Sequence, residues 1–162
     1  MSRLDSFIRR LEAQRRCLDR AAELMAGIEG PVIELGLGNG RTFDHLRTLM
    51  PARAIFAFDR QMSAHPSCIP KDRFFIRGNF EDTLPGALEH IGGAAALCHA
   101  DIGSGDKSGS VALARAVAPM IDRLMAGGGI VLGDQPMTIE RWVSLSLPDG
   151  VDAGRYFLYR VG

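Results

Sequence analysis

The chain has 162 residues, close to the commonest size of a single domain, and 46% of them are hydrophobic, so it can bury a core of its own. Its 19 basic and 19 acidic residues cancel to a formal net charge of zero, which excludes the basic excess typical of nucleic-acid binding. No apolar run approaches the roughly 20 residues that a membrane span needs. These bounds predict one domain over residues 1–162, with neither nucleic acid nor a membrane as its partner.

The first expected element is a helix over residues 3–26. Ser2 followed by Asp5 is typical of a capping box, and Gly27 is expected to end the helix. Acidic residues interleave with the arginines, which disfavours both a targeting peptide and a membrane-surface helix. We expect a helical extension over 1–27 that packs on the domain and whose apolar stripe supports a homo-oligomer. The stripe consists of Leu4, Phe7, Ile8, Leu11, Leu18, Ala21, Ala22 and Met25.

From Pro31 onward, short apolar runs alternate with helical stretches, which is typical of an α/β fold with a mostly parallel sheet covered on both faces. The predicted strands are 32–35, 54–58, 74–76, 94–98 and 129–132, and the predicted helices are 42–49, 84–91 and 111–125. Pro119 is expected to kink or split the last helix. Residues 61–71 are expected to form a loop or one short turn.

The end of the chain predicts two further strands, 142–147 and 155–161. Only Pro148-Asp149-Gly150 and a few neighbours separate them, which is too short for a parallel crossover, so we expect a C-terminal antiparallel hairpin.

Three cysteines, Cys17, Cys68 and Cys98, are far apart and lack a C-x-x-C spacing. An odd number at such distances indicates free thiols rather than a disulfide framework or a zinc site. Free thiols are typical of a reducing compartment, and we expect a cytoplasmic protein.

The strongest motif is a buried strand followed by a glycine turn, Val32-Ile33-Glu34-Leu35-Gly36-Leu37-Gly38-Asn39-Gly40. Glycines let the backbone turn tightly and approach a ligand, and the helix that follows presents free N–H groups to the same crevice. A dinucleotide fingerprint requires a third glycine where Arg41 stands. The acid Glu34 also departs from a phosphate site, whereas it suits S-adenosylmethionine, which carries an ammonium and a sulfonium but no phosphate.

This stretch resembles motif I of the class I S-adenosylmethionine-dependent methyltransferases, and the resemblance covers roughly residues 30–162. Within that superfamily the chain is similar to a small family described as S-adenosyl-L-methionine methyltransferases. The resemblance implies a Rossmann-like three-layer fold with seven strands and S-adenosyl-L-methionine as the cofactor. It implies cofactor contacts from Glu34, Gly36, Leu37, Gly38, Asn39, Gly40, Thr42, Asp59, Arg60, Gly78, Asn79, Phe80 and Asp101.

Several of these residues follow individual strands. Asp59 ends the strand after the glycine turn and can accept both ribose hydroxyls, and the resemblance places Arg60 against the adenine. The resemblance also places Asn79 at the adenine amino group, with Asp82 as the alternative, and Phe80 on the ring face.

The acceptor side is expected beyond the fourth and fifth strands. His99 is the candidate general base by its intrinsic pKa, and Asp101 is expected to meet the methionine ammonium or the acceptor. Asp101 and Asp134 match two acids of the metal-dependent catechol-type enzymes, but Gln135 stands where those enzymes have Asn. We therefore expect no metal, with His99, Asp101 and Asp134 as the catalytic residues. Residues 103–109 are expected to form a mobile loop on this side.

The predicted function is transfer of a methyl group from S-adenosylmethionine to a small-molecule acceptor. Three alternatives remain open at this point: a metal-dependent catechol-type O-methyltransferase, a non-catalytic S-adenosylmethionine-binding protein and an NAD-binding oxidoreductase.

Overall fold

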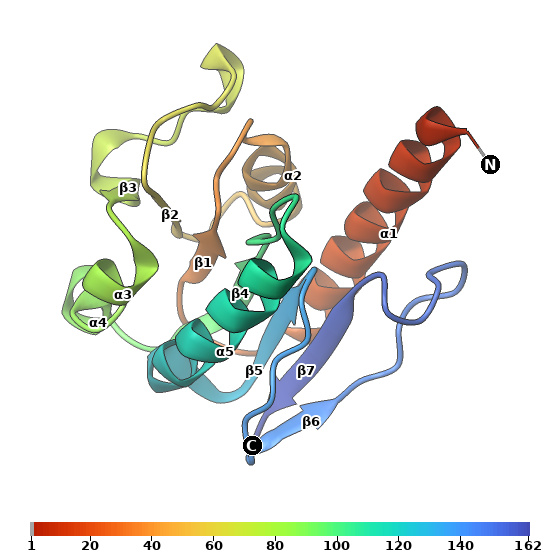
Figure 1. The fold of residues 1–162 in the computed structure, drawn as a ribbon. Helices are drawn as coiled ribbons and strands as arrows, with labels where there is room; N and C mark the ends of the chain where they lie inside the picture. Colours follow the sequence, from red (N-terminus) through yellow and green to blue (C-terminus); the bar gives the residue numbers. More distant parts are fainter. Residues whose placement is uncertain (1) are drawn as a thin grey trace.

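A seven-stranded sheet forms the centre of the molecule in the computed structural model, which describes residues 2–162 (Figure 1). The strand order is β3-β2-β1-β4-β5-β7-β6. Strands β2 and β3 therefore lie on one side of β1, and β4 and the later strands lie on the other. In open α/β sheets, the ligand site lies at the carboxyl ends of the strands where the strand order reverses in this way.

Five neighbouring strands run parallel and the last two are antiparallel, as predicted. The parallel strands are β1 (Val32–Leu35), β2 (Ile55–Asp59), β3 (Phe75–Arg77), β4 (Ala95–Ala100) and β5 (Met125–Gly133). The C-terminal pair consists of β6 (Trp142–Ser144) and β7 (Phe157–Val161). Every residue of β1 and β4 is buried, because helices cover the sheet on both sides.

Two helices cover one face of the sheet and three cover the other (Figure 1). The first face carries α1 (Arg3–Leu24) and α2 (Arg41–Leu49), and the second carries α3 (Phe80–Thr83), α4 (Ala87–His90) and α5 (Lys107–Leu124). Each face has its own apolar core: Leu18 and Leu46 belong to the first, and Leu84, Val117 and Ile121 to the second. The three-layer α/β fold is confirmed.

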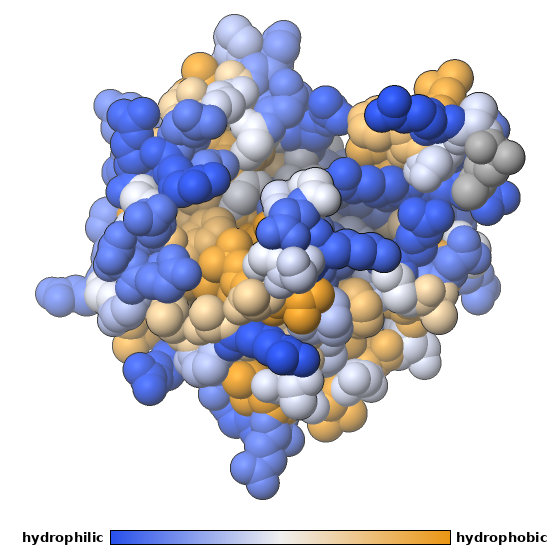
Figure 2. Space-filling model, in the orientation of Figure 1, coloured by the Kyte–Doolittle hydropathy of each residue, from blue (hydrophilic) through white to orange (hydrophobic). Residues whose placement is uncertain are grey.

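The N-terminal helix α1 begins at the predicted capping box, in which the Asp5 amide and the Ser2 hydroxyl are 3.0 Å apart. Its second half is buried against the sheet and α2, whereas its first turns extend beyond them. Leu4, Phe7 and Ile8 are exposed there, and hydrophobic surface is visible at that end of the helix in Figure 2. No helix among residues 2–162 is long and apolar enough to cross a membrane.

Three local predictions need correction. The helix expected over 84–91 shortens to α4, and a further short helix, α3, precedes it. Helix α5 begins at Lys107, so residues 107–109, which were predicted to belong to a loop, form its first turn. Pro119 does not interrupt α5, because it lies on the exposed side of the helix, where water can hydrate the carbonyl that loses its partner. The cysteines Cys17, Cys68 and Cys98 are free and buried.

Candidate functional site

The glycine turn between β1 and α2 takes a backbone shape that other residues resist. Gly36, Gly38 and Gly40 have φ values of 86°, 48° and 86°. A Cβ on Gly36 would lie 2.2 Å from the Asp101 carbonyl oxygen, so β1 and β4 approach too closely there for any side chain. A Cβ on Gly38 would meet nothing within 4 Å, because this residue faces open space.

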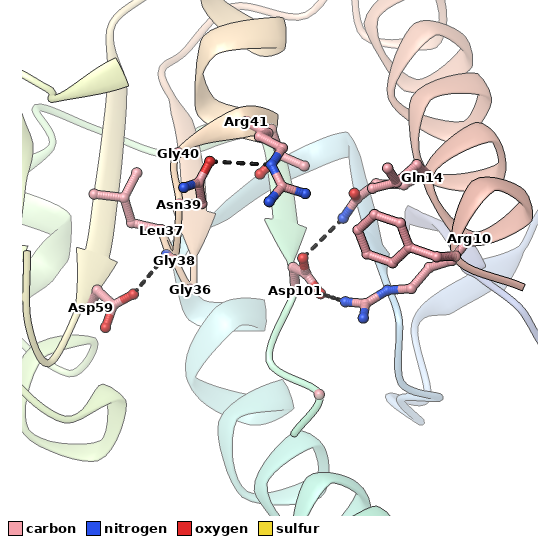
Figure 3. A pocket seen from close by; sticks show the side chains of 14 residues that line it. Arg10, Gln14, Gly36, Leu37, Gly38, Asn39, Gly40, Arg41, Asp59 and Asp101 are labelled. Atoms are coloured by element: carbon pink, nitrogen blue, oxygen red, sulfur yellow. Dashed lines mark hydrogen bonds and ion pairs between the residues drawn. The ribbon is translucent and has the colours of Figure 1, made fainter. Parts of the chain in front are cut away.

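A pocket of about 400 Å³ opens over this turn, and we call it the glycine-turn pocket (Figure 3). The turn after β1, the start of α2 and the ends of β2 and β4 form one wall, and the N-terminal helix α1 forms the other. The lining residues are Phe7, Arg10, Leu11, Gln14, Gly36, Leu37, Gly38, Asn39, Gly40, Arg41, Thr42, Asp59, Asp101 and Gly103.

A second pocket of about 450 Å³ continues from the first on the side of β2 and β3, and we call it the Phe80 pocket. The two pockets share four residues, Gly36, Asp59, Asp101 and Gly103. The Phe80 pocket adds Arg60, Asn79, Phe80, Glu81, Ile102, Ser104, Gly109, Ser110 and Leu113. Together they make one elongated site along the carboxyl ends of β1, β2 and β4.

Asp59 stands where the two pockets meet. Its Oδ2 accepts a hydrogen bond of 3.0 Å from the Gly38 amide, and its Oδ1 one of 3.3 Å from the Gln61 amide. The carboxylate is thereby held at the end of β2 and stays partly exposed. A carboxylate in this position can accept a pair of hydroxyl groups from a ligand.

Asp101, directly after β4, is the second carboxylate shared by the two pockets. Its Oδ2 accepts a 2.9 Å hydrogen bond from Nε2 of Gln14, and its Oδ1 lies 3.4 Å from Nη2 of Arg10. Both partners project from α1 toward Asp101 in Figure 3. Neither Gln14 nor Arg10 was predicted from the sequence as a site residue. The available signal was Gln14 itself, a polar residue three positions after Leu11 and four before Leu18 on the apolar stripe of the helix.

Glu34 and His99 lie behind the pocket wall rather than in it, which corrects the expectation that they contact cofactor and acceptor directly. Both are 0% exposed, and Oε2 of Glu34 lies 2.7 Å from Nδ1 of His99. Glu34 also accepts from Thr42, and Nε2 of His99 is 2.5 Å from the hydroxyl of Tyr156. Burial acts to lower the pKa of His99, but the charge and hydrogen bond of Glu34 outweigh it and raise that pKa.

The remaining predicted residues divide between the site and its surroundings. Leu37, Asn39 and Thr42 line the glycine-turn pocket, and Arg60, Asn79 and Phe80 line the other. Gly78, with φ of 152°, is absent from both linings and forms the turn after β3. Asp82 accepts a 3.2 Å hydrogen bond from Asn79 and is likewise outside the lining.

Asp134 follows β5 and holds the loop after β4. Its carboxylate accepts hydrogen bonds of 3.1 Å from the Ile102 amide and 2.9 Å from the Gly103 amide. Burial, followed by the charge of Asp101, raises the pKa of Asp134. Nε2 of Gln135 lies 3.2 Å from the same carboxylate. Among residues 2–162, no group of three or more His, Cys, Asp or Glu side chains could hold a metal ion.

A third pocket of about 660 Å³ lies beyond β5, and we call it the Lys107 pocket. It is lined by Lys107, Ser108, Val111, Ala112, Arg115, Asp134, Gln135, Pro136, Gly154 and Phe157. The first turns of α5 separate it from the Phe80 pocket. Asp134 therefore connects this pocket with the loop that carries Gly103.

The fold is that of known methyltransferases. TrmN from Thermus thermophilus superposes with a TM-score of 0.59 at 16% identity, over 89% of this chain and 48% of that chain. The plantazolicin methyltransferase BpumL in complex with SAH (S-adenosylhomocysteine) gives a TM-score of 0.53 at 11% identity, over 81% of this chain and 49% of that chain. At these identities the likeness establishes the fold alone.

The family follows from two closer similarities. The model of the family described as S-adenosyl-L-methionine methyltransferase matches residues 1–161. A crystal structure of an S-adenosyl-L-methionine methyl transferase from Silicibacter pomeroyi DSS-3 is 42% identical, with a TM-score of 0.94 over 100% of this chain and 99% of that one. No curated protein matches the chain significantly. The chain belongs to the S-adenosyl-L-methionine methyltransferase family, which confirms the predicted enzyme class and cofactor.

Proposed function

We propose that the chain methylates a small molecule, and that its cofactor lies across the glycine-turn pocket and the Phe80 pocket. The observation that carries this proposal is the pair of carboxylates, Asp59 and Asp101, in the wall that the two pockets share. One elongated ligand bound there would meet an acid at its middle and another toward one end.

The polar groups of the site match the parts of S-adenosylmethionine in order. Arg60, Asn79 and Phe80 line the end suited to adenine, with Phe80 offering a ring face. Asp59 suits the ribose hydroxyls, because the two oxygens of a carboxyl group can accept hydrogen bonds from a pair of hydroxyls.

The amino-acid part of the cofactor has complementary charges in the glycine-turn pocket. Asp101 suits the ammonium, and Arg10 and Arg41, both exposed in the same pocket, suit the carboxylate. The open space at Gly38 leaves room for a ligand to touch the main chain. The residues present therefore fit the cofactor.

When bound, S-adenosylmethionine supplies a methyl group on a positively charged sulfur, and the protein supplies orientation and a deprotonated acceptor. We assign removal of the acceptor proton to Asp134, since a carboxylate with a raised pKa is a stronger base than an ordinary one. We place the acceptor beside Asp134 and Gly103, with the Lys107 pocket as its entry. His99 has no route to an acceptor there, because it is fully buried.

The acceptor class is tested by incubating the protein with S-adenosylmethionine that carries a labelled methyl group. Cell metabolites, total RNA and total protein are offered as separate acceptors. The proposal expects label in the metabolite fraction, and it expects that label to fall in Asp134→Asn while SAH binding persists. Label confined to RNA or protein would contradict the small-molecule acceptor.

Two further proposals concern the context of the enzyme. The exposed side chains Leu4, Phe7 and Ile8 at the free end of α1 support a homo-oligomer formed through that helix. The three free cysteines support a location in the cytoplasm.

A further inference from the structure

A chain of buried hydrogen bonds runs behind the glycine-turn pocket and reaches it at Asp101. It starts at Glu34 on β1, passes through His99 on β4 and Tyr156 before β7, and continues to Gln14 on α1. The successive distances are 2.7 Å from Glu34 to His99, 2.5 Å from His99 to Tyr156, 3.2 Å from Tyr156 to Gln14 and 2.9 Å from Gln14 to Asp101.

The four residues of this chain that precede Asp101 are deeply buried. Glu34 and His99 are 0% exposed, Tyr156 is 3% and Gln14 is 6%. Removing such polar groups from water costs free energy unless each has a partner, so their geometry is tightly constrained. No buried side-chain nitrogen or oxygen within residues 2–162 lacks a hydrogen-bond partner.

One assignment of protons gives each of the four hydrogen bonds along the chain a donor and an acceptor. In its neutral form, with the proton on Nδ1, His99 donates to Glu34 and accepts at Nε2 from the Tyr156 hydroxyl. Burial, followed by the charge of Asp101, raises the pKa of Tyr156 well above its usual value, so the hydroxyl keeps its proton. The two amide protons of Gln14 then go to Tyr156 and Asp101.

We propose that Gln14 and Tyr156 are positioning residues that aim the Asp101 carboxylate at the amino-acid part of the cofactor, with His99 and Glu34 as their buried anchor. The inference rests on the proposed cofactor position. It makes α1 a component of the site, since Gln14 reaches Asp101 across 87 positions of sequence. It also gives His99 a role that does not require contact with the acceptor.

The test compares two ligands that share an adenosine but differ at the end facing Asp101. SAH has the amino-acid part, and 5′-methylthioadenosine lacks it. In Gln14→Leu we expect binding of SAH to weaken about tenfold, because Asp101 loses a donor that fixes its direction, while 5′-methylthioadenosine changes by less than about twofold. A general loosening of the fold would weaken both ligands alike.

Tyr156→Phe serves as the second variant, because it removes a single oxygen and keeps the ring beside His99. We expect it to weaken SAH about threefold, again without weakening 5′-methylthioadenosine. Tyr159→Phe is the matched control: the same oxygen is lost from a buried tyrosine whose partner is the Met137 amide, away from the chain. We expect the ratio of the two affinities to stay unchanged in the control.

The outcomes separate this inference from the function on which it rests. If the wild-type protein binds neither ligand, the proposed cofactor site fails. If it binds both, and the ratio of affinities in Tyr156→Phe equals that in Tyr159→Phe, the positioning role is overturned while the cofactor site stands. Should Gln14→Leu fail to fold, the tyrosine pair decides the question alone.

Discussion

The two sides of the proposed active site are built differently. On the proposed cofactor side, the residues lie in short sequence motifs at strand ends: the turn over 36–40 and the acid Asp59. On the proposed acceptor side, the lining of the Lys107 pocket comes from α5, the loop after β5 and the segment that leads into β7. If this assignment holds, the cofactor site is encoded locally, whereas the environment of the acceptor depends on how distant segments meet.

The largest effect is expected from a substitution that disturbs the backbone of the glycine turn. In Gly36→Ala, the added Cβ would lie 2.2 Å from the Asp101 carbonyl oxygen at a φ of 86°, so β1 and β4 must separate. We expect a loss of at least about 3 kcal/mol in the free energy of unfolding and no measurable SAH binding. Urea unfolding followed by circular dichroism measures the first of these.

Gly105→Ala is the control for that substitution, because a Cβ at Gly105 would meet nothing within 4 Å. We expect its free energy of unfolding to stay within about 0.5 kcal/mol of the wild type. Equal stability of the two variants would show that the close approach of β1 and β4 does not exist.

The next largest effect is expected from a substitution that removes a proposed ligand contact without disturbing the fold. Asp59→Ala should weaken SAH binding by about 1.5–3 kcal/mol, or roughly ten- to a hundredfold, since it removes a charged acceptor for the ribose. Calorimetric titration measures the change, and thermal unfolding of the free protein checks the fold. Binding within about twofold of the wild type would remove Asp59 from the cofactor site.

A smaller effect is expected at Asp134, on the proposed acceptor side, where the stability of the fold should depend on pH. Because burial raises the pKa of Asp134 in the folded protein, ionisation of this group destabilises the fold at neutral pH, and the penalty disappears once the group is protonated in both states. We expect Asp134→Asn to unfold at a higher urea concentration than the wild type at pH 7. The difference should shrink as the pH falls from the raised pKa of the folded state toward the usual carboxyl value of 3.8, and it should vanish below that value.

A difference between Asp134→Asn and the wild type that is constant over this pH range would contradict the raised pKa. The same variant should bind SAH within about twofold of the wild type, because Asp134 lies outside both cofactor pockets.

The smallest effect concerns the free end of α1. Leu4 and Ile8 are 66% and 45% exposed, so their replacement by lysine removes apolar surface from solvent contact at little cost to the fold. We expect Leu4→Lys/Ile8→Lys to sediment as a monomer at concentrations where the wild type associates. A wild-type chain that stays monomeric throughout the micromolar range would rule out the homo-oligomer.

The sequence predicted the parts of the fold that depend on local pattern. Apolar runs located the five parallel strands, and the short connection around Pro148 located the antiparallel pair. The glycine spacing and Asp59 predicted residues that the structure brings together in one pocket, because each of them stands at or just after a strand end. Helix ends were less accurate, since the burial of α3 and α4 against β2 and α5 depends on tertiary contacts.

The partners of Asp101 could not be predicted, because they come from segments far apart in sequence. Gln14 lies 87 positions away from Asp101, and Tyr156 lies 57 away from His99. The sequence places His99 and Asp101 two positions apart but gives no information on what covers them. These buried partners are the reason that we propose His99 as an anchor of the site rather than as a base.

Calorimetric titration of three proteins with SAH tests the proposed position of the cofactor most directly. Wild-type protein should bind one SAH per chain and should not bind NAD. Asp59→Ala and Asp101→Ala should each weaken SAH about tenfold or more while their thermal unfolding stays close to that of the wild type. Binding of NAD in place of SAH, or an SAH affinity that is unchanged in both variants, would contradict the proposed cofactor site.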